Sequence, residues 1–217
     1  MIDASLHALE GLRDPTTLEW YVVPLLAILF YVYAIEIKQA RRTRNWDAVV
    51  AGATLFGMDF FNETWNGWVL NLTGYSALWT VPGDTALRTM VGWNIEIMFM
   101  FALSGVVYYH TCSEDPTERI LGVPDRWFWA IVYSAFCVLI ETVLNAGGLL
   151  VWAYPFWTLS VAGVWLIFLI GYFHFYVAVI LVLKLERARS RAIAVGSIYA
   201  VAIAMNVFGM GIMGWTY

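Results

Sequence analysis

The chain has 217 residues, of which 61% are hydrophobic and only 13% are charged, whereas a soluble domain has about 25% charged residues. Apolar runs of about 20 residues recur, which predicts a helical integral membrane protein and excludes a barrel of short alternating strands. The net charge is −4 and no basic, aromatic-interleaved patch is present, so we expect no nucleic-acid partner.

The first 17 residues predict a short helix in the membrane interface, because Ile2, Leu6 and Leu9 form an apolar stripe that ends at Gly11. Six longer apolar segments follow, each expected to cross the membrane once. They cover about residues 18–37, 47–70, 87–109, 127–146, 159–183 and 192–214. No internal repeat divides the chain. We therefore predict one all-α domain over residues 1–217, a bundle of about six transmembrane helices.

The distribution of basic residues predicts the orientation. Loops 38–46, 110–126 and 184–191 contain 4, 2 and 4 Lys or Arg, which is 10 of the 12 in the chain. Only Arg13 and Arg88 belong to the other side. Because basic loops stay on the cytoplasmic side, both termini are expected to be non-cytoplasmic.

The second expected span carries a polar face inside an apolar run. Asp59, Asn62, Glu63 and Asn66 are spaced i, i+3, i+4 and i+7, which places them on one side of a helix. A charge exposed to lipid would cost several kcal/mol. This face is therefore expected to point at other protein or at a cavity.

Three glutamates are predicted to lie at one level. Counted from the expected helix ends, Glu63, Glu96 and Glu141 lie roughly 9–13 Å below the outer surface. We expect them to share a polar pocket in the outer half of the bundle. Apart from Arg88 at the outer rim, no Lys or Arg lies inside the spans to pair them. Three unpaired carboxylates cannot all stay ionised in a low dielectric, and a protonated one is a proton donor.

Further side chains are candidate substrate contacts at this level. The polar ones are Asn94, Asn145 and Asn206, together with His174, which is expected to lie deeper, past the midplane; the aromatic ones are Trp65 and Trp93. Taken singly, each Asn and His174 is more simply explained by helix packing. Trp65 and Trp93 adjoin glutamates, where an aromatic face stabilises a cation. The remaining aromatic residues near the outer ends are predicted to be interface anchors: Trp79, Trp152, Tyr154, Trp157 and Trp215.

Metal and cofactor chemistry is not indicated. Three histidines are too few for a membrane diiron enzyme, and no lysine lies inside a span to hold retinal. Cys112 and Cys137 have no metal-ligand spacing. We expect no metal and no cofactor, and as partners only a lipophilic small molecule and membrane lipid.

Two motifs follow a first span that runs into a basic loop. They are Asn62-Glu63-Thr64-Trp65 in the second span and Trp93-Asn94-Ile95-Glu96 in the third. In this layout, residues 25–110 resemble the small integral-membrane terpene cyclases of meroterpenoid and indole-terpenoid pathways. The resemblance implies acid catalysis on an isoprenoid-type substrate. We expect Glu63 to protonate an alkene or epoxide. Glu96 and Glu141 are expected to set the pKa of Glu63 or to take the final proton.

Two other functions remain open. A proton-coupled transporter or channel would use the same glutamates, although transporters more often show internal repeats and broken helices. A lipid-binding membrane protein without catalysis is the third hypothesis.

Overall fold

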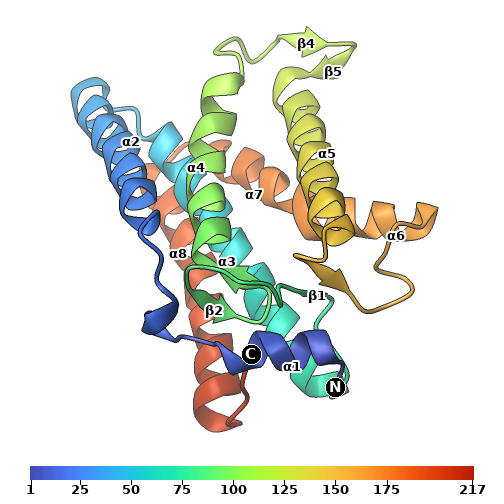
Figure 1. The fold of residues 1–217 in the computed structure, drawn as a ribbon. Helices are drawn as coiled ribbons and strands as arrows, with labels where there is room; N and C mark the ends of the chain where they lie inside the picture. The colour runs from blue at the N-terminus through green and yellow to red at the C-terminus, as the bar shows by residue number, and fades with distance from the viewer.

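The computed structural model describes all 217 residues and is mostly helical (Figure 1). Its helices are α1 (Asp3–Glu10), α2 (Val22–Thr43), α3 (Asp47–Thr73), α4 (Ile95–Thr111), α5 (Asp125–Ala146), α6 (Val161–Leu166), α7 (His174–Leu183) and α8 (Ala188–Asn206). A 3₁₀ turn, η1 (Pro15–Thr17), precedes α2. Two π-helical segments, η2 (Ile167–Phe173) and η3 (Val207–Ile212), join α6 to α7 and extend α8.

Three short antiparallel ribbons lie at the two ends of the bundle. They pair β1 (Trp79–Thr80) with β6 (Val151–Trp152), β2 (Arg88–Met90) with β3 (Trp93–Asn94), and β4 (Arg119–Ile120) with β5 (Val123–Pro124). The β4–β5 ribbon lies at the end opposite to α1 and both termini (Figure 1). The all-α prediction thus describes the bundle but omits these ribbons.

Four helical segments are long and apolar enough to cross a membrane: Val22–Thr43, Asp125–Ala146, Val161–Leu183 and Ala188–Ile212. Helix α4 is apolar but shorter. Helix α3 carries the polar face and packs against α4, α7 and α8, so it lies at the centre of the bundle. This position follows from its sequence, because a helix with carboxylates in an apolar run needs protein around it.

Helices α3 and α4 approach closely through glycines. A Cβ atom added to Gly105 would lie 2.7 Å from the Cα atom of Gly52 and would also clash with the backbone of Ala51. Small residues of this kind let membrane helices pack backbone to backbone. Tyr33 of α2 joins this contact by donating its hydroxyl to the Ala102 carbonyl at 2.7 Å.

The helix boundaries lie close to the predicted ones except in the first and third apolar segments. Helix α2 (Val22–Thr43) continues past the predicted end at residue 37 and includes the basic residues Lys38, Arg41 and Arg42. Helix α1 ends at Glu10 and Gly11 caps it, as predicted. The third segment was expected to be helical from residue 87, but α4 begins only at Ile95, after the β2–β3 ribbon. The Asn94 side chain stops the helix from extending back, because it accepts the Ile97 N–H at 2.9 Å as an N-cap.

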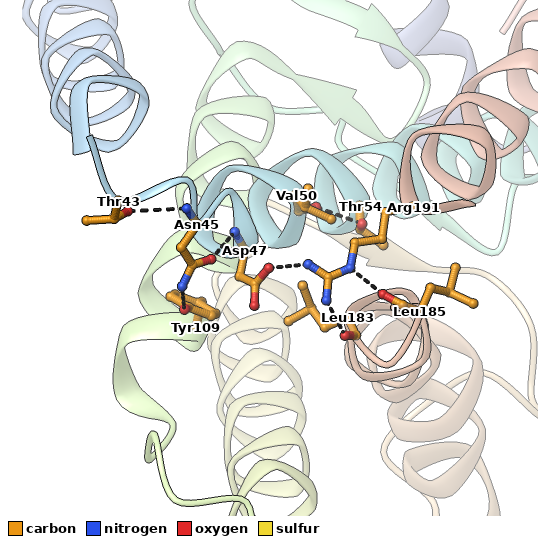
Figure 2. A network of polar contacts seen from close by, with 9 residues as sticks. All are labelled: Thr43, Asn45, Asp47, Val50, Thr54, Tyr109, Leu183, Leu185 and Arg191. Atoms are coloured by element: carbon orange, nitrogen blue, oxygen red, sulfur yellow. Dashed lines mark hydrogen bonds and ion pairs between the residues drawn. The ribbon is translucent and has the colours of Figure 1, made fainter. Parts of the chain in front are cut away.

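A polar network closes the end of the bundle near the β4–β5 ribbon (Figure 2). Asn45 accepts the backbone N–H of Asp47, the first residue of α3, at 2.9 Å. Asp47 forms an ion pair with Arg191 of α8. Arg191 also donates to the carbonyls of Leu183 and Leu185, at 2.8 and 2.6 Å. One arginine therefore ties α3, α7 and α8 together.

Candidate functional site

A cavity of about 130 Å³ lies between α3, α4, α5 and the η2–α7 segment. Of its 21 lining residues, 14 are hydrophobic, so its walls are mainly apolar and aromatic. Four of the remaining residues are acids or amides: Asp59, Asn62 and Glu63 of α3, and Glu141 of α5. The polar face of α3 therefore points into the protein, as its spacing indicated, and two of the three predicted glutamates share one cavity.

Each carboxylate in the cavity accepts a hydrogen bond from a tryptophan indole. The side chains of Asp59, Glu63 and Glu141 are buried, with 2–4% of each residue exposed. The three bonds are Trp93 Nε1 to Asp59 Oδ2 at 2.7 Å, Trp79 Nε1 to Glu63 Oε1 at 2.8 Å, and Trp152 Nε1 to Glu141 Oε1 at 2.9 Å. The indole N–H is a neutral donor. It therefore satisfies one oxygen of each carboxyl group but cannot neutralise the negative charge of an ionised carboxylate.

The β1–β6 ribbon delivers two of these indoles. Trp79 and Trp152 are directly paired across it, and paired residues in an antiparallel ladder project to the same face. Trp157 stacks on Trp79 with ring centroids 5.6 Å apart. Sequence reasoning assigned these three tryptophans to an interface belt, but Trp79 and Trp157 are buried and line the cavity. No pattern in the sequence predicts that the segments containing Trp79 and Trp152, 73 residues apart, pair with each other.

No basic side chain balances the three acids. The ion pairs in the structure are His110 with Glu36 and Arg191 with Asp47. Arg88 is buried in strand β2, but its guanidinium donates to the backbone carbonyls of Ala8 and Gly83 and not to a carboxylate. The second oxygen of Glu63, Oε2, is buried without a hydrogen-bond partner. An unpaired buried charge is costly. No three His, Cys, Asp or Glu side chains are arranged to hold a metal ion.

The amides of α3 fix the surrounding backbone. Asn62 accepts the Trp65 indole N–H at 2.6 Å and donates to the carbonyl of Gly171 in η2 at 3.3 Å. Asn66 accepts the Leu78 N–H and donates to the Trp79 carbonyl, both at 2.8 Å. These bonds satisfy a carbonyl of the π-helix and hold strand β1 over the cavity. Asn62 and Asn66 are thus positioning residues for the cavity walls.

Gly92 brings the turn of the β2–β3 ribbon onto the same glutamate. A Cβ atom at position 92 would lie 2.7 Å from Glu63 Oε2 and 2.6 Å from the Trp79 ring. A side chain there would meet both partners of the Trp79–Glu63 bond. The absence of a side chain at this position therefore allows the turn to cover the carboxylate.

Glu96 does not join the other two glutamates, which corrects the predicted three-glutamate pocket. Its carboxylate accepts the Tyr21 hydroxyl at 2.5 Å, the Thr85 hydroxyl at 2.6 Å and the Ala86 N–H at 3.0 Å. The depth estimate counted from residue 87, whereas α4 begins at Ile95. Glu96 consequently lies in the first helical turn and anchors the chain before α2.

The other predicted contacts lie outside the cavity lining. Asn94 caps α4, Asn145 donates to the Leu150 carbonyl at 3.0 Å, and Asn206 donates to Thr64 at 2.7 Å. His174 lies 3.3 Å from the Leu169 carbonyl within its own helical segment. These residues have structural partners, as the helix-packing explanation supposes. Sequence reasoning did not assign three polar lining residues to the pocket: Ser104, Cys137 and Tyr176.

Comparisons with known proteins place the chain in a family. It is 42% identical over 213 residues to an uncharacterized protein of Archaeoglobus fulgidus, an alignment that covers 98% of each chain. No solved structure matches the chain. The model of an uncharacterized membrane protein family matches residues 2–211. The chain therefore belongs to this uncharacterized membrane protein family, and it is an integral membrane protein.

Proposed function

We propose that this protein is a membrane-embedded acid catalyst that cyclises or isomerises an apolar, isoprenoid-type substrate. One observation carries the proposal: Asp59, Glu63 and Glu141 line an aromatic cavity without any cation, and each is held by an indole N–H. A carboxylic acid kept neutral in apolar surroundings is a suitable proton donor. The resemblance of residues 25–110 to membrane terpene cyclases supports the same reaction class.

The cavity is sized for the reacting end of such a substrate. An engineered cavity of about 150 Å³ holds a benzene molecule, so about 130 Å³ accommodates one prenyl-sized group. The lining residues Met100 of α4 and Phe136 of α5 are 39% and 56% exposed. The proposed opening is therefore lateral, between α4 and α5, and the rest of the chain would stay in lipid.

Glu63 is the proposed acid, because its Oε2 is free of other hydrogen bonds. Its proton adds to a carbon of the alkene or to the epoxide oxygen, which leaves a carbocation and a Glu63 carboxylate. Aromatic rings of the lining, such as Phe101 and Trp157, stabilise the cation. Loss of a proton from carbon to Glu141 or Asp59 then gives the product alkene. The reaction is redox-neutral and needs no cofactor.

The proposal includes a six-span topology with both termini non-cytoplasmic. Helices α3 and α4 supply the two spans beyond the four apolar ones. The central position of α3 shields its acids from lipid, and the β2–β3 ribbon extends the short α4 segment toward the outer surface. The cavity then lies in the outer half, beneath α1 and the β1–β6 ribbon.

The test uses purified protein in detergent with candidate prenyl alkenes and epoxides. Glu63→Gln keeps the side-chain shape but removes the acid, so turnover should fall by about 10²–10⁴ while substrate still binds. Glu96→Gln is the matched control, since Glu96 lies outside the cavity, and it should retain turnover. Product formation at the wild-type rate in Glu63→Gln would remove Glu63 as the acid.

A proton-coupled transporter is the second candidate, and one observation favours it. The π-helix η2 interrupts the α6–α7 segment beside the cavity, and Asn62 bonds its Gly171 carbonyl. Helix irregularities at a buried site are a feature of transporters. Proton uptake driven by a solute gradient in vesicles, lost in Glu63→Gln, would establish this function. Binding of lipid that is insensitive to Glu63→Gln, with neither turnover nor transport, would support the lipid-binding hypothesis.

A further inference from the structure

A tyrosine that lines the cavity has a hydroxyl without a hydrogen-bond partner. Tyr176 is fully buried, lines the same cavity as Glu63 and Glu141, and its hydroxyl is unpaired. Buried polar groups in native proteins are nearly always satisfied by protein or water. One water needs about 10–15 Å³ of such space, so a cavity of about 130 Å³ has room for several.

The hydroxyls continue from Tyr176 toward the β4–β5 end of the bundle. The rings of Tyr176 and Tyr133 have centroids 5.8 Å apart. The Tyr133 hydroxyl lies 2.7 Å from Thr111 Oγ1. Thr111 is the last residue of α4 and is partly exposed. Tyr176, Tyr133 and Thr111 thus follow one another from the cavity to the partly exposed end of α4, where Thr111 Oγ1 also donates to the Val107 carbonyl at 2.9 Å.

Helix α5 carries both a hydroxyl of this series, Tyr133, and a cavity carboxylate, Glu141. Tyr133, Cys137 and Glu141 are spaced by four residues, all line the cavity, and span roughly 12 Å along the helix. Tyr108 also packs against Tyr176, with ring centroids 5.0 Å apart. Its hydroxyl donates to the Arg126 carbonyl at 2.7 Å, and Tyr108, unlike Tyr133 and Tyr176, does not line the cavity.

The other directions out of the cavity are apolar. A cluster of buried apolar residues that contains Leu78, Trp79, Leu150 and Trp157 covers the end beneath the β1–β6 ribbon. The lateral opening between α4 and α5 is lined by Met100, Phe136 and Ile140. Ser104 also lines the cavity on the α4 side, but its hydroxyl donates to the Met100 carbonyl at 2.8 Å, and no second hydroxyl of the lining follows it on that side. The series Tyr176, Tyr133 and Thr111 is therefore the hydroxyl path that leads away from the carboxylates.

We propose that Tyr176, Tyr133 and Thr111, joined by cavity water, carry protons between the cavity carboxylates and the β4–β5 end of the protein. Each hydroxyl passes its proton to the next oxygen and takes one from the oxygen behind it, so no hydroxyl is consumed and no redox change occurs. The proposal rests on the proposed function only in treating the carboxylates as proton carriers. It holds equally for catalysis and for transport.

The test is hydrogen–deuterium exchange of the cavity acids, which needs no substrate. Purified protein is mixed rapidly into D₂O, and the shift of the carboxylic C=O infrared bands is followed. The bands are assigned with Asp59→Asn, Glu63→Gln and Glu141→Gln. Exchange should slow at least tenfold in Tyr133→Phe and Tyr176→Phe, and remain at the wild-type rate in the control Tyr108→Phe.

Wild-type exchange rates in folded Tyr133→Phe and Tyr176→Phe would overturn the relay. Folding is checked by size-exclusion chromatography, and Thr111→Val at the partly exposed end makes the same test if either Phe variant fails. The absence of any C=O band at neutral pH would instead refute a protonated Glu63. The relay would then be measured as the rate at which the band appears after a drop in pH, with the same variants and the same expected slowing.

Discussion

Trp79 and Trp152 face each other across the β1–β6 ribbon, and each donates its indole N–H to a different buried glutamate. The ribbon is only two residues long on each side. It nevertheless connects the carboxylate of α3 to that of α5 through two loops distant in sequence. The geometry of the candidate site thus depends on a small structure outside the helices.

The first prediction removes these donors. Trp79→Phe and Trp152→Phe each keep an aromatic ring but leave a buried glutamate oxygen without its hydrogen bond. Loss of one partner of a buried bond costs about 1–3 kcal/mol, and we expect a decrease of this size in the free energy of unfolding, measured by denaturant titration in mixed micelles. The proposed turnover should also fall, because the orientation of Glu63 or Glu141 is lost.

The matched control is Trp129→Phe. Trp129 also donates to a carboxylate, Asp125, at 3.1 Å, but neither residue lines the cavity. It should lose stability while retaining turnover. Equal effects of Trp129→Phe and Trp79→Phe on turnover would show that the indole bonds in the cavity have no special role.

Local periodicity predicted the α3 part of the site, and long-range pairing determined the rest. The i, i+3, i+4, i+7 spacing placed Asp59 and Glu63 on one buried face, because helical geometry alone fixes that relation. Glu96 was misplaced because the predicted boundary ignored the N-cap at Asn94. Short apolar runs do not distinguish a ribbon from the start of a helix. The register of the β1–β6 ribbon depends on tertiary contacts that a single sequence does not encode locally.

The second prediction concerns Gly92. Gly92→Ala introduces a Cβ atom into contact with Glu63 Oε2 and the Trp79 ring. Overpacking of this kind costs about 1–3 kcal/mol, and displacement of Glu63 should reduce turnover as well. Gly196→Ala in α8 is the control, since nothing lies within 4 Å of a Cβ atom there. A Gly92→Ala protein with wild-type stability and turnover would refute the close contact.

The third prediction is a pH dependence at the anchor before α2. The hydrogen bond that Tyr21 donates to Glu96 raises the pKa of the Tyr21 hydroxyl to about 12, from an ordinary value near 10. Because the folded state holds this proton more tightly, the stabilisation is fully present below about pH 10. It is lost as the pH rises toward about 12. Tyr21→Phe should not show this loss between pH 10 and 12.

Tyrosinate absorbance near 295 nm measures the effect directly. The difference between the titrations of wild type and Tyr21→Phe isolates Tyr21. In Glu96→Gln the carboxylate partner is gone, so the Tyr21 titration should move back toward its ordinary pKa. A Tyr21 titration near pH 10 in the wild-type protein would contradict the short contact with Glu96.

The fourth prediction is the proposed topology. In a background without Cys112 and Cys137, single cysteines are placed at the exposed positions Asp3, Thr216 and Arg189. An impermeant maleimide added to whole cells should label positions 3 and 216 but not 189. Labelling at 189 alone would reverse the orientation, and labelling at 3 without 216 would rule out an even number of spans.

The fifth prediction concerns the polar network at the opposite end of the bundle (Figure 2). Arg191 pairs with Asp47 and donates to two backbone carbonyls near the end of α7, so it joins three helices. Asp47→Asn and Arg191→Gln should each destabilise the protein. Because the two side chains are in contact and mostly shielded, their double-mutant coupling should be about 0.5–3 kcal/mol.

The backbone bonds of Arg191 give this cycle an asymmetry. Arg191→Gln loses the ion pair and the bonds to Leu183 and Leu185, whereas Asp47→Asn loses only the ion pair. The arginine variant should therefore be the less stable of the two, as measured by denaturant titration in mixed micelles. Arg187→Gln, which alters an exposed arginine of the same loop, should stay within about 0.5 kcal/mol of the wild type. Additive losses in the double variant would show that the ion pair contributes nothing to folding. The network would then serve only to cap α7.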